Sequence, residues 1–330
     1  MTFKHIAIIS ILVAGTLLAS ATGVFAVCVT ADCHAILGKA RVVHSPVAAA
    51  ECDSCHRATG KAHPGAGSME LAGKGRDLCL SCHADPAKGQ PFVHPPVADA
   101  CTDCHNPHQS ANARLLLQPG GKLCLMCHDS VTQGEEVHGP VAAGSCAMCH
   151  APHASANPAL MIRPANEPCL ACHVQIEQII KTAKSQHEPV ASGRCWECHT
   201  PHSSNYSPLL RANYPIAFYS PYSESNFALC FTCHDKNAME YERTSEATGF
   251  RNRDRNLHYF HVNRPVKGRV CKSCHGVHGA DQGKLLLSDV PHFGNWDIPL
   301  RWVETENGAA CYVGCHRPKL YDRLKRINNP

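Results

Sequence analysis

The cysteines of this chain occur in pairs, and a histidine follows the second cysteine of every pair. With 22 cysteines and 24 histidines in 330 residues, chance does not produce so regular an association. Two thiols separated by two residues match the two vinyl groups of haem, to which they attach through thioether bonds. The histidine that follows is then placed to bind the iron. The spacing therefore predicts covalent haem c at each pair, eleven in all, with that histidine as the proximal ligand.

Nine of the pairs have the ordinary two-residue spacing. They are Cys52/Cys55, Cys79/Cys82, Cys101/Cys104, Cys124/Cys127, Cys146/Cys149, Cys169/Cys172, Cys195/Cys198, Cys230/Cys233 and Cys271/Cys274. The other two, Cys28/Cys33 and Cys311/Cys315, have four and three intervening residues, so the motif alone does not establish haem attachment there. The predicted proximal ligands are His34, His56, His83, His105, His128, His150, His173, His199, His234, His275 and His316.

Zinc ribbons and disulfides are the alternative interpretations of paired cysteines. A structural zinc site uses two cysteine pairs per metal and does not need a histidine after each pair. A disulfide scaffold leaves the histidines unexplained. Haem attachment accounts for both residue types.

The sixth iron ligand decides whether such a protein carries electrons or performs catalysis. Apart from His5 and the proximal histidines, twelve candidates remain: His44, His63, His94, His108, His138, His153, His187, His202, His258, His261, His278 and His292. Each lies between or beside haem motifs, whereas the alternative, an ordinary surface or core histidine, would have to apply repeatedly. Eleven ligands are needed, so one candidate is spare, and either His258 or His261 is the residue that we expect to be left over. Histidine on both sides of every iron leaves no open position for a substrate and favours electron transfer.

One spacing predicts which irons these histidines serve. His105 and His108 lie three residues apart, so on a helical turn they point to the same side and do not clamp one haem from both faces. We therefore expect His108, and equally His153, His202 and His278, to bind a haem other than that of the adjacent motif. Each would hold two haems close together.

The motifs form a repeat. The first cysteines at Cys79, Cys124 and Cys169 are each 45 residues apart, and a second motif follows 22 to 26 residues later. The organisation that we predict is a cleaved secretory signal (1–26), an N-terminal dihaem segment (27–75), three doubled repeats (76–228), a fourth, expanded doubled repeat (229–288) and a C-terminal single-haem segment (289–330).

The first 26 residues have a basic start, an apolar run and small residues before the expected cleavage point, a pattern typical of a secretory signal. We expect an exported protein in the periplasm, associated with the outer membrane, or outside the cell. No other segment approaches the roughly 20 apolar residues of a membrane-spanning helix.

Charge argues against nucleic acid as a partner. The formal charge is +4, but each ferric haem with two ionised propionates contributes about −1. After removal of the signal and its Lys4, eleven haems bring the oxidised protein to about −8. An anionic protein of this kind is poorly suited to binding a phosphate backbone.

The composition predicts the fold class. Only 6% of residues are aromatic, and the mature chain has roughly 28 residues per haem, too few for a conventional core. We expect a multihaem cytochrome c fold, mostly irregular coil with short α-helices wrapped round a chain of stacked haems, with minimal β-structure. Residues 298–303 have the local pattern of a strand.

The sequences ending Cys-His-Asn-Pro-His108, Cys-His-Ala-Pro-His153 and Cys-His-Thr-Pro-His202 resemble the signature of multihaem c-type cytochromes with doubled CXXCH motifs. The resemblance covers nearly the whole mature chain. It implies a haem chain that carries electrons across the periplasm or outer membrane towards extracellular acceptors. The implied partners are other redox proteins, such as cytochromes, and an outer-membrane porin.

Two other functions remain open. A multihaem nitrite or hydroxylamine oxidoreductase needs one five-coordinate haem, and the sequence has no Cys-x-x-Cys-Lys site. A homopolymeric extracellular filament could form if a spare histidine of one subunit bound a haem of the next.

Two further segments have alternative interpretations. The aromatic stretch 206–227 could be a partner surface, but we expect it to pack over porphyrin edges. The charged insertion 235–264 could dock a redox partner, but we expect a solvated loop.

Overall fold

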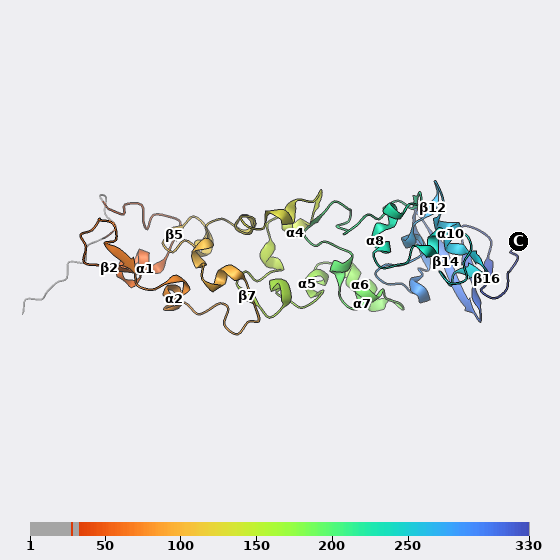
Figure 1. Cartoon of the computed structure of the whole chain (residues 1–330), viewed down its shortest axis with the longest axis horizontal. Helices are drawn as coiled ribbons and strands as arrows, with labels where there is room; N and C mark the ends of the chain where they lie inside the picture. Colours follow the sequence, from red (N-terminus) through yellow and green to blue (C-terminus); the bar gives the residue numbers. More distant parts are fainter. Residues whose placement is uncertain (1–27, 29–32, 330) are drawn as a thin grey trace, which may run out of the picture.

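The computed structural model describes Cys28 and residues 33–329, with residues 291–293 described by their backbone only. The predicted signal segment, 1–26, lies outside these residues. The molecule is elongated, and the repeats follow one another along its length in sequence order (Figure 1). The cysteine motifs are numbered 1 to 11 in chain order, from Cys28/Cys33 to Cys311/Cys315.

The α-helices are short, as the Pro- and Gly-rich sequence predicts. Their bounds are α1 Ser45–Ala48, α2 Gly75–Leu80, α3 Gly121–Cys124, α4 Gly139–Ala142, α5 Glu167–Leu170, α6 Val174–Thr182, α7 Glu188–Ala191, α8 Ala228–Phe231, α9 Asn237–Glu240 and α10 Leu257–Val262. Helices α1, α4 and α7 each have proline in the first turn, where the missing amide proton costs no hydrogen bond. No helix in residues 33–329 is long and apolar enough to cross a bilayer.

The motifs lie on two kinds of turn. The first cysteines of motifs 3, 5, 7 and 9 lie on α2, α3, α5 and α8. Five others lie on 3-10 turns: Cys52–Ser54, Cys101–Asp103, Cys146–Met148, Cys195–Glu197 and Cys271–Ser273. In both kinds the amide of the proximal histidine donates to the carbonyl of the first cysteine, as from His105 to Cys101 at 3.0 Å. One turn thus places two thiols and an imidazole together.

The remaining 3-10 turns lie between the motifs. They are Pro95–Ala98, Ala113–Leu115, Asp129–Thr132, Pro158–Leu160, Glu224–Phe227 and Gly283–Leu285.

Paired short strands connect each repeat to the next. The antiparallel pairs are β1 Val42–Val43 with β5 Gln109–Ser110, β4 Phe92–Val93 with β7 Ala154–Ser155, and β6 Glu136–Val137 with β8 Ser203–Ser204. A single bridge from Ser185 to Ala280 occupies the equivalent place in the next repeat. Each pair joins segments more than 60 residues apart.

The other strands form three more pairs and one larger sheet. The pairs are β2 His56–Ala58 with β3 Met69–Leu71, β9 Tyr219–Ser220 with β12 Gly268–Arg269, and β10 Arg251–Asn252 with β11 Arg255–Asn256. The sheet is an antiparallel meander at the C-terminal end: β13 Asp289–Phe293, β14 Trp296–Thr305, β15 Gly308–Val313 and β16 Lys319–Asp322. The strand expected at 298–303 is confirmed inside β14.

The described residues contain a small hydrophobic core towards the C-terminal end, formed by Leu210, Tyr214, Phe227, Val262 and Val270. Tyr214 and Phe227 belong to the aromatic stretch and pack edge to face, with ring centres 6.0 Å apart. This part of the stretch is interior to the protein and is not an exposed partner surface, whereas its packing over porphyrin edges stays a prediction.

The expectation of a solvated loop at 235–264 is wrong. This insertion contains α9, the β10–β11 hairpin and α10. Asn256 is fully buried, and its side-chain amide donates to the carbonyls of Ala238 and Tyr241 at 2.9 and 2.8 Å. Its side-chain oxygen accepts from the amide of Tyr259 and caps α10. Local hydrogen bonds of one buried amide therefore order a segment whose composition is polar.

The core predicts a local stability effect. Because Phe227 is fully buried, we expect Phe227→Ala to lower the free energy of opening of this region by about 3 kcal/mol or more. Hydrogen–deuterium exchange of the holoprotein over residues 210–230 measures this. Phe92→Ala, at a side chain that is 39% exposed, is the matched control and should change exchange far less. Equal effects of the two variants would contradict the assignment of the core.

Candidate haem-binding sites

The histidine rings of the structure face one another in pairs. Ten of the predicted proximal histidines lie opposite a distal candidate, with ring centres 5.8 to 6.5 Å apart and ring planes 14 to 33° from parallel. The pairs are His34–His63, His56–His108, His83–His44, His105–His153, His128–His94, His150–His202, His173–His138, His199–His278, His234–His187 and His275–His258.

The separation fits an iron atom between the rings. Rings in direct contact would lie about 3.5 to 4 Å apart. A metal–nitrogen bond of about 2 Å on each side, plus about 1.1 Å from each nitrogen to its ring centre, gives roughly 6 Å. The observed pairs have this spacing, so their geometry is suited to six-coordinate iron with two axial histidines.

Hydrogen bonds fix the tautomer of many of these rings. The Nδ1 atoms of eight histidines lie 2.6 to 3.2 Å from a backbone carbonyl oxygen: His44, His94, His105, His150, His199, His261, His275 and His316. A carbonyl only accepts, so Nδ1 carries the proton and donates. The lone pair is therefore on Nε2, which is left to bind a metal. A second hydrogen-bonding shell of this kind is typical of metal-ligating histidines.

Most of the facing pairs join different repeats. His108, which follows motif 4, lies opposite His56 of motif 2, and His153 after motif 6 lies opposite His105 of motif 4. His202 and His278 continue this backward pattern towards motifs 6 and 8. The histidines that precede α1, the 3-10 turn at Pro95, α4 and α7 reach forward instead. These pairs are His44 with motif 3, His94 with motif 5, His138 with motif 7 and His187 with motif 9.

The segments that carry the forward-reaching histidines are hydrogen-bonded to the segments that carry the backward-reaching ones. The amide of His44 donates to the carbonyl of His108 at 2.9 Å, and the same bond recurs from His94 to His153. A third joins His138 to His202, also at 2.9 Å. These bonds extend the β1–β5, β4–β7 and β6–β8 pairs, so two distal histidines for two different motifs enter from one hydrogen-bonded junction.

The cysteines show that consecutive motifs are neighbours. Besides burial, the first cysteine of a neighbouring motif raises the pKa of the first cysteine in five places: Cys28 acts on Cys52, Cys101 on Cys79, Cys146 on Cys124, Cys195 on Cys169 and Cys271 on Cys230. Between these pairs, burial and the charge of a thiol in the adjacent motif raise the pKa of one cysteine: Cys55 acts on Cys79, Cys127 on Cys104, Cys172 on Cys149, Cys233 on Cys198 and Cys311 on Cys274. Every motif from 1 to 11 thus lies near the next in sequence order.

The two cysteines of a motif differ in exposure in the odd-numbered motifs but not in the even-numbered ones. In the odd-numbered motifs the second cysteine is exposed, whereas in the even-numbered motifs both cysteines are half-buried. The exposed cysteines are Cys33, Cys82, Cys127, Cys172, Cys233 and Cys315.

The chain that follows each motif explains this difference. After an even-numbered motif the chain folds back over the second cysteine, as where the amide of Leu117 donates to the carbonyl of Cys104 at 2.9 Å. The chain after motif 3 instead leads away, and Cys82 receives only a local contact, from the Ser81 hydroxyl to its sulfur at 3.8 Å. An exposed sulfur can still reach a vinyl group, so the thioether bonds of the exposed cysteines stay a prediction.

The doubled CXXCH motif family matches this chain at residues 44–88, 94–133, 138–178 and 187–239, which is more than half of the sequence. The chain belongs to this family. It is a multihaem c-type cytochrome with covalently bound haem c. Each matched segment begins at one of the forward-reaching histidines, His44, His94, His138 and His187, and contains two motifs. A search of curated proteins found no match.

The cysteines and histidines do not converge as they would in a zinc site. Within residue 28 and residues 33–329, no group of three or more His, Cys, Asp or Glu side chains is arranged to hold a single metal ion. The cysteines from Cys52 to Cys315 are free thiols, as haem attachment requires.

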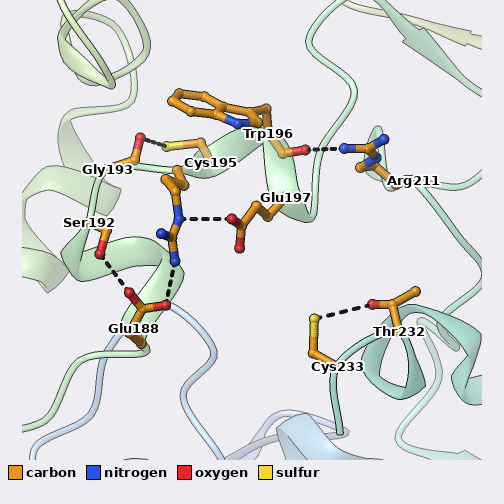
Figure 2. Close-up of polar contacts among 10 residues, drawn as sticks. Glu188, Ser192, Gly193, Cys195, Trp196, Glu197, Arg211, Thr232 and Cys233 are labelled. Atoms are coloured by element: carbon orange, nitrogen blue, oxygen red, sulfur yellow. Dashed lines mark hydrogen bonds and ion pairs between the residues drawn. The ribbon is translucent and has the colours of Figure 1, made fainter.

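The family's attachment turn is held by local polar contacts, as Figure 2 shows for motifs 8 and 9. Arg194 pairs with Glu188 at 2.5 Å and with Glu197 at 2.8 Å, which links α7 to the turn of motif 8. The Thr232 hydroxyl donates to the Cys233 sulfur at 3.8 Å. These pairs are exposed, so each stabilises the fold by no more than about 1 kcal/mol.

Sequence reasoning missed the carbonyls that orient the proximal rings. The Nδ1 atoms of His105, His150 and His275 donate to the carbonyls of Arg114, Ala159 and Lys284, each nine residues later. Those three residues have φ of 57, 53 and 60°, the left-handed region that costs non-glycine residues about 1 kcal/mol or more. The repeated leucine-rich tail after each of these motifs was the available signal.

Motif 11 has the least complete description. His316 donates from Nδ1 to the carbonyl of Arg317 at 2.7 Å, and the side chain of the candidate His292 lies outside the described residues. His258 and His261 lie on α10, and each uses Nδ1 in a hydrogen bond, with the Thr248 hydroxyl and the Leu257 carbonyl. His258 faces His275 of motif 10. Burial lowers the pKa of His261, and the charge of the nearby His316 adds to this effect.

Burial also favours the form of these rings that binds iron. It lowers the pKa of His258 to about 4, with a further contribution from His275. Burial likewise lowers the pKa of His108, His153, His187, His202 and His278. Neutral imidazole is the metal-binding form, so the distal positions favour it.

The crossing pattern gives a site-specific prediction. We expect His153→Ala to convert the haem on Cys101/Cys104, opposite His105, from low-spin to high-spin, because its axial ligand is removed. Low-temperature EPR of the oxidised protein measures the change, and a second variant that lacks Cys101 and Cys104 identifies the haem. Pro152→Ala keeps the ring and serves as the control. A high-spin signal that survives loss of Cys101 and Cys104 would contradict the pairing.

Proposed function

We propose that this protein is an undecahaem electron carrier in which histidine binds each iron on both sides. The facing histidine pairs are the observation that carries the proposal. Ten of the eleven proximal histidines have a partner at the separation that bis-histidine iron requires. For the eleventh, His316, we propose His261, because its Nε2 is free and its ring lies near His316. His292 is then the spare histidine in place of His258 or His261.

Bound haem supplies reversible one-electron chemistry, and the chain's residues arrange it for conduction. The proximity of consecutive motifs favours a single file from motif 1 to motif 11 along the length of the molecule (Figure 1). Axial histidines on both faces exclude substrate and limit rearrangement when the iron changes oxidation state. These features support electron transfer more than catalysis, including a nitrite or hydroxylamine conversion.

We further propose that the protein acts after export, in the periplasm or at the outer membrane. There it would pass electrons between other redox proteins, held by an outer-membrane porin and with extracellular metal as an acceptor. The support is the secretory pattern of residues 1–26 together with an elongated shape that suits conduction over distance.

A filament held by ligand exchange between subunits is the second candidate. It requires a histidine from one subunit to complete a haem of the next. Because ten proximal histidines already face a histidine of the same chain, we favour conduction within one chain.

The haem inventory tests the proposal. We expect the mass of the purified holoprotein to correspond to eleven attached haems, with only low-spin ferric signals in EPR. The reduced protein should bind no carbon monoxide, because each sixth position is occupied by nitrogen. One high-spin haem that binds carbon monoxide would instead favour an enzyme. Electron microscopy of the same sample distinguishes single particles from filaments.

A further inference from the structure

Arg269, beside motif 10 in the sequence, reaches a cysteine of motif 11 and forms no ion pair with a carboxylate of the described residues. Arg269 is on β12, opposite Tyr219 of β9, two residues before the first cysteine of motif 10. Its guanidinium carbon lies 4.7 Å from the ring centres of both Phe218 and Tyr219. Strand pairing and two aromatic rings therefore hold this charge in one position.

The same guanidinium touches motif 11. Its Nη2 lies 3.5 Å from the sulfur of Cys315. Arg269 thus contacts an attachment cysteine of motif 11 from the strand that leads into motif 10.

The charge is not neutralised by the protein. In the described part of the chain, Arg269 forms no ion pair, and its Nη1 atom is buried without a hydrogen-bond partner. A buried donor on a charged group is costly unless it meets an acceptor, and the acceptors that haem adds to such a site are propionate carboxylates. The unpartnered Nη1 therefore fits a site that is completed by haem.

The surrounding sequence has the same sign of charge. Residues 251–330 contain 14 Lys and Arg against 7 Asp and Glu, whereas residues 33–250 contain 16 against 19. The C-terminal end of the molecule is thus the basic end. The net positive charge of residues 251–330 and the charge of Arg269 both favour the reduced form of a nearby haem.

We propose that Arg269 raises the reduction potential of the haem on Cys311/Cys315 and so makes the C-terminal end the electron-accepting end of the haem chain. This inference rests on the proposed function. Haem held by Cys271/Cys274 would be the one-electron donor and would be oxidised from ferrous to ferric, and haem held by Cys311/Cys315 would be the acceptor and would be reduced from ferric to ferrous. The fixed positive charge stabilises the product side, because reduction makes the haem of motif 11 more negative by one unit.

Spectroelectrochemical titration of the holoprotein tests this proposal. In Arg269→Gln we expect one high-potential component to shift downwards by about 59 mV or more, which is a tenfold change in a one-electron equilibrium constant. The variant lacking Cys311 and Cys315 should lack that component. Arg269→Lys, which keeps the charge, should retain most of the potential. Arg301→Gln is the matched control. Arg301 also lies over an aromatic ring, 5.8 Å from the centre of Tyr312, but it belongs to the β13–β16 sheet.

Three outcomes would overturn the inference. One is an Arg301→Gln shift as large as that of Arg269→Gln, since net charge alone would then explain it. Another is an Arg269→Lys shift as large as that of Arg269→Gln, which would make the effect structural. The third is persistence of the shifting component without Cys311 and Cys315. Mass spectrometry keeps the two proposals separate: a wild-type protein without the eleventh haem refutes the haem inventory, whereas eleven haems with an unmoved potential refute the role of Arg269.

Discussion

In the proposed bis-histidine sites, the distance between two imidazole nitrogens that share one iron constrains nearly everything else in this molecule. Among residues 33–209 of the described structure, no hydrophobic side chain is buried, so this part of the chain has no conventional core. Ring pairs about 6 Å apart replace it, and most of them join residues from different repeats. Because the binding energy of a metal site counts as folding energy in such proteins, the proposed axial ligands would also hold the repeats together.

The crossing pattern makes the fold nearly one-dimensional. Each junction, such as that of His44 with His108, supplies one ligand forwards and one backwards, so each repeat depends on its two neighbours. Stability in such an array is approximately a sum of local and nearest-neighbour terms. The proposed electron transfer needs the same arrangement, because transfer occurs between adjacent sites. In that proposal the fold and the pathway follow one line, and further copies of the repeat would lengthen both.

The sequence predicted the chemistry of the sites better than their connections. Cysteine spacing and the supply of histidines indicated haem and two axial ligands, and the short distance from His105 to His108 indicated that His108 serves another motif. That argument assumed a helical turn, whereas residues 106–108 are not helical and lead into β5. The partner, His56, depends on a strand pair between residues more than 60 positions apart, and spacing carries no information about such a pair. The left-handed residues Arg114, Ala159 and Lys284 were equally hidden, because none has the residue type that usually marks this conformation.

The two ends of the molecule are stabilised by different interactions, so one end of the chain differs from the other. The repeats have exposed peptide segments and histidine pairs, but the C-terminal end has a four-stranded sheet and a core around Phe227. A packed protein environment can hold a charge in a fixed place, as Phe218 and Tyr219 do for Arg269, whereas the solvated repeats screen the charges of their side chains. Haems bound in similar repeats would have similar surroundings, which gives them few protein contacts that distinguish their potentials. The folded C-terminal end therefore provides an environment that the repeats lack, and the last haem-binding sites differ from the others in their surroundings.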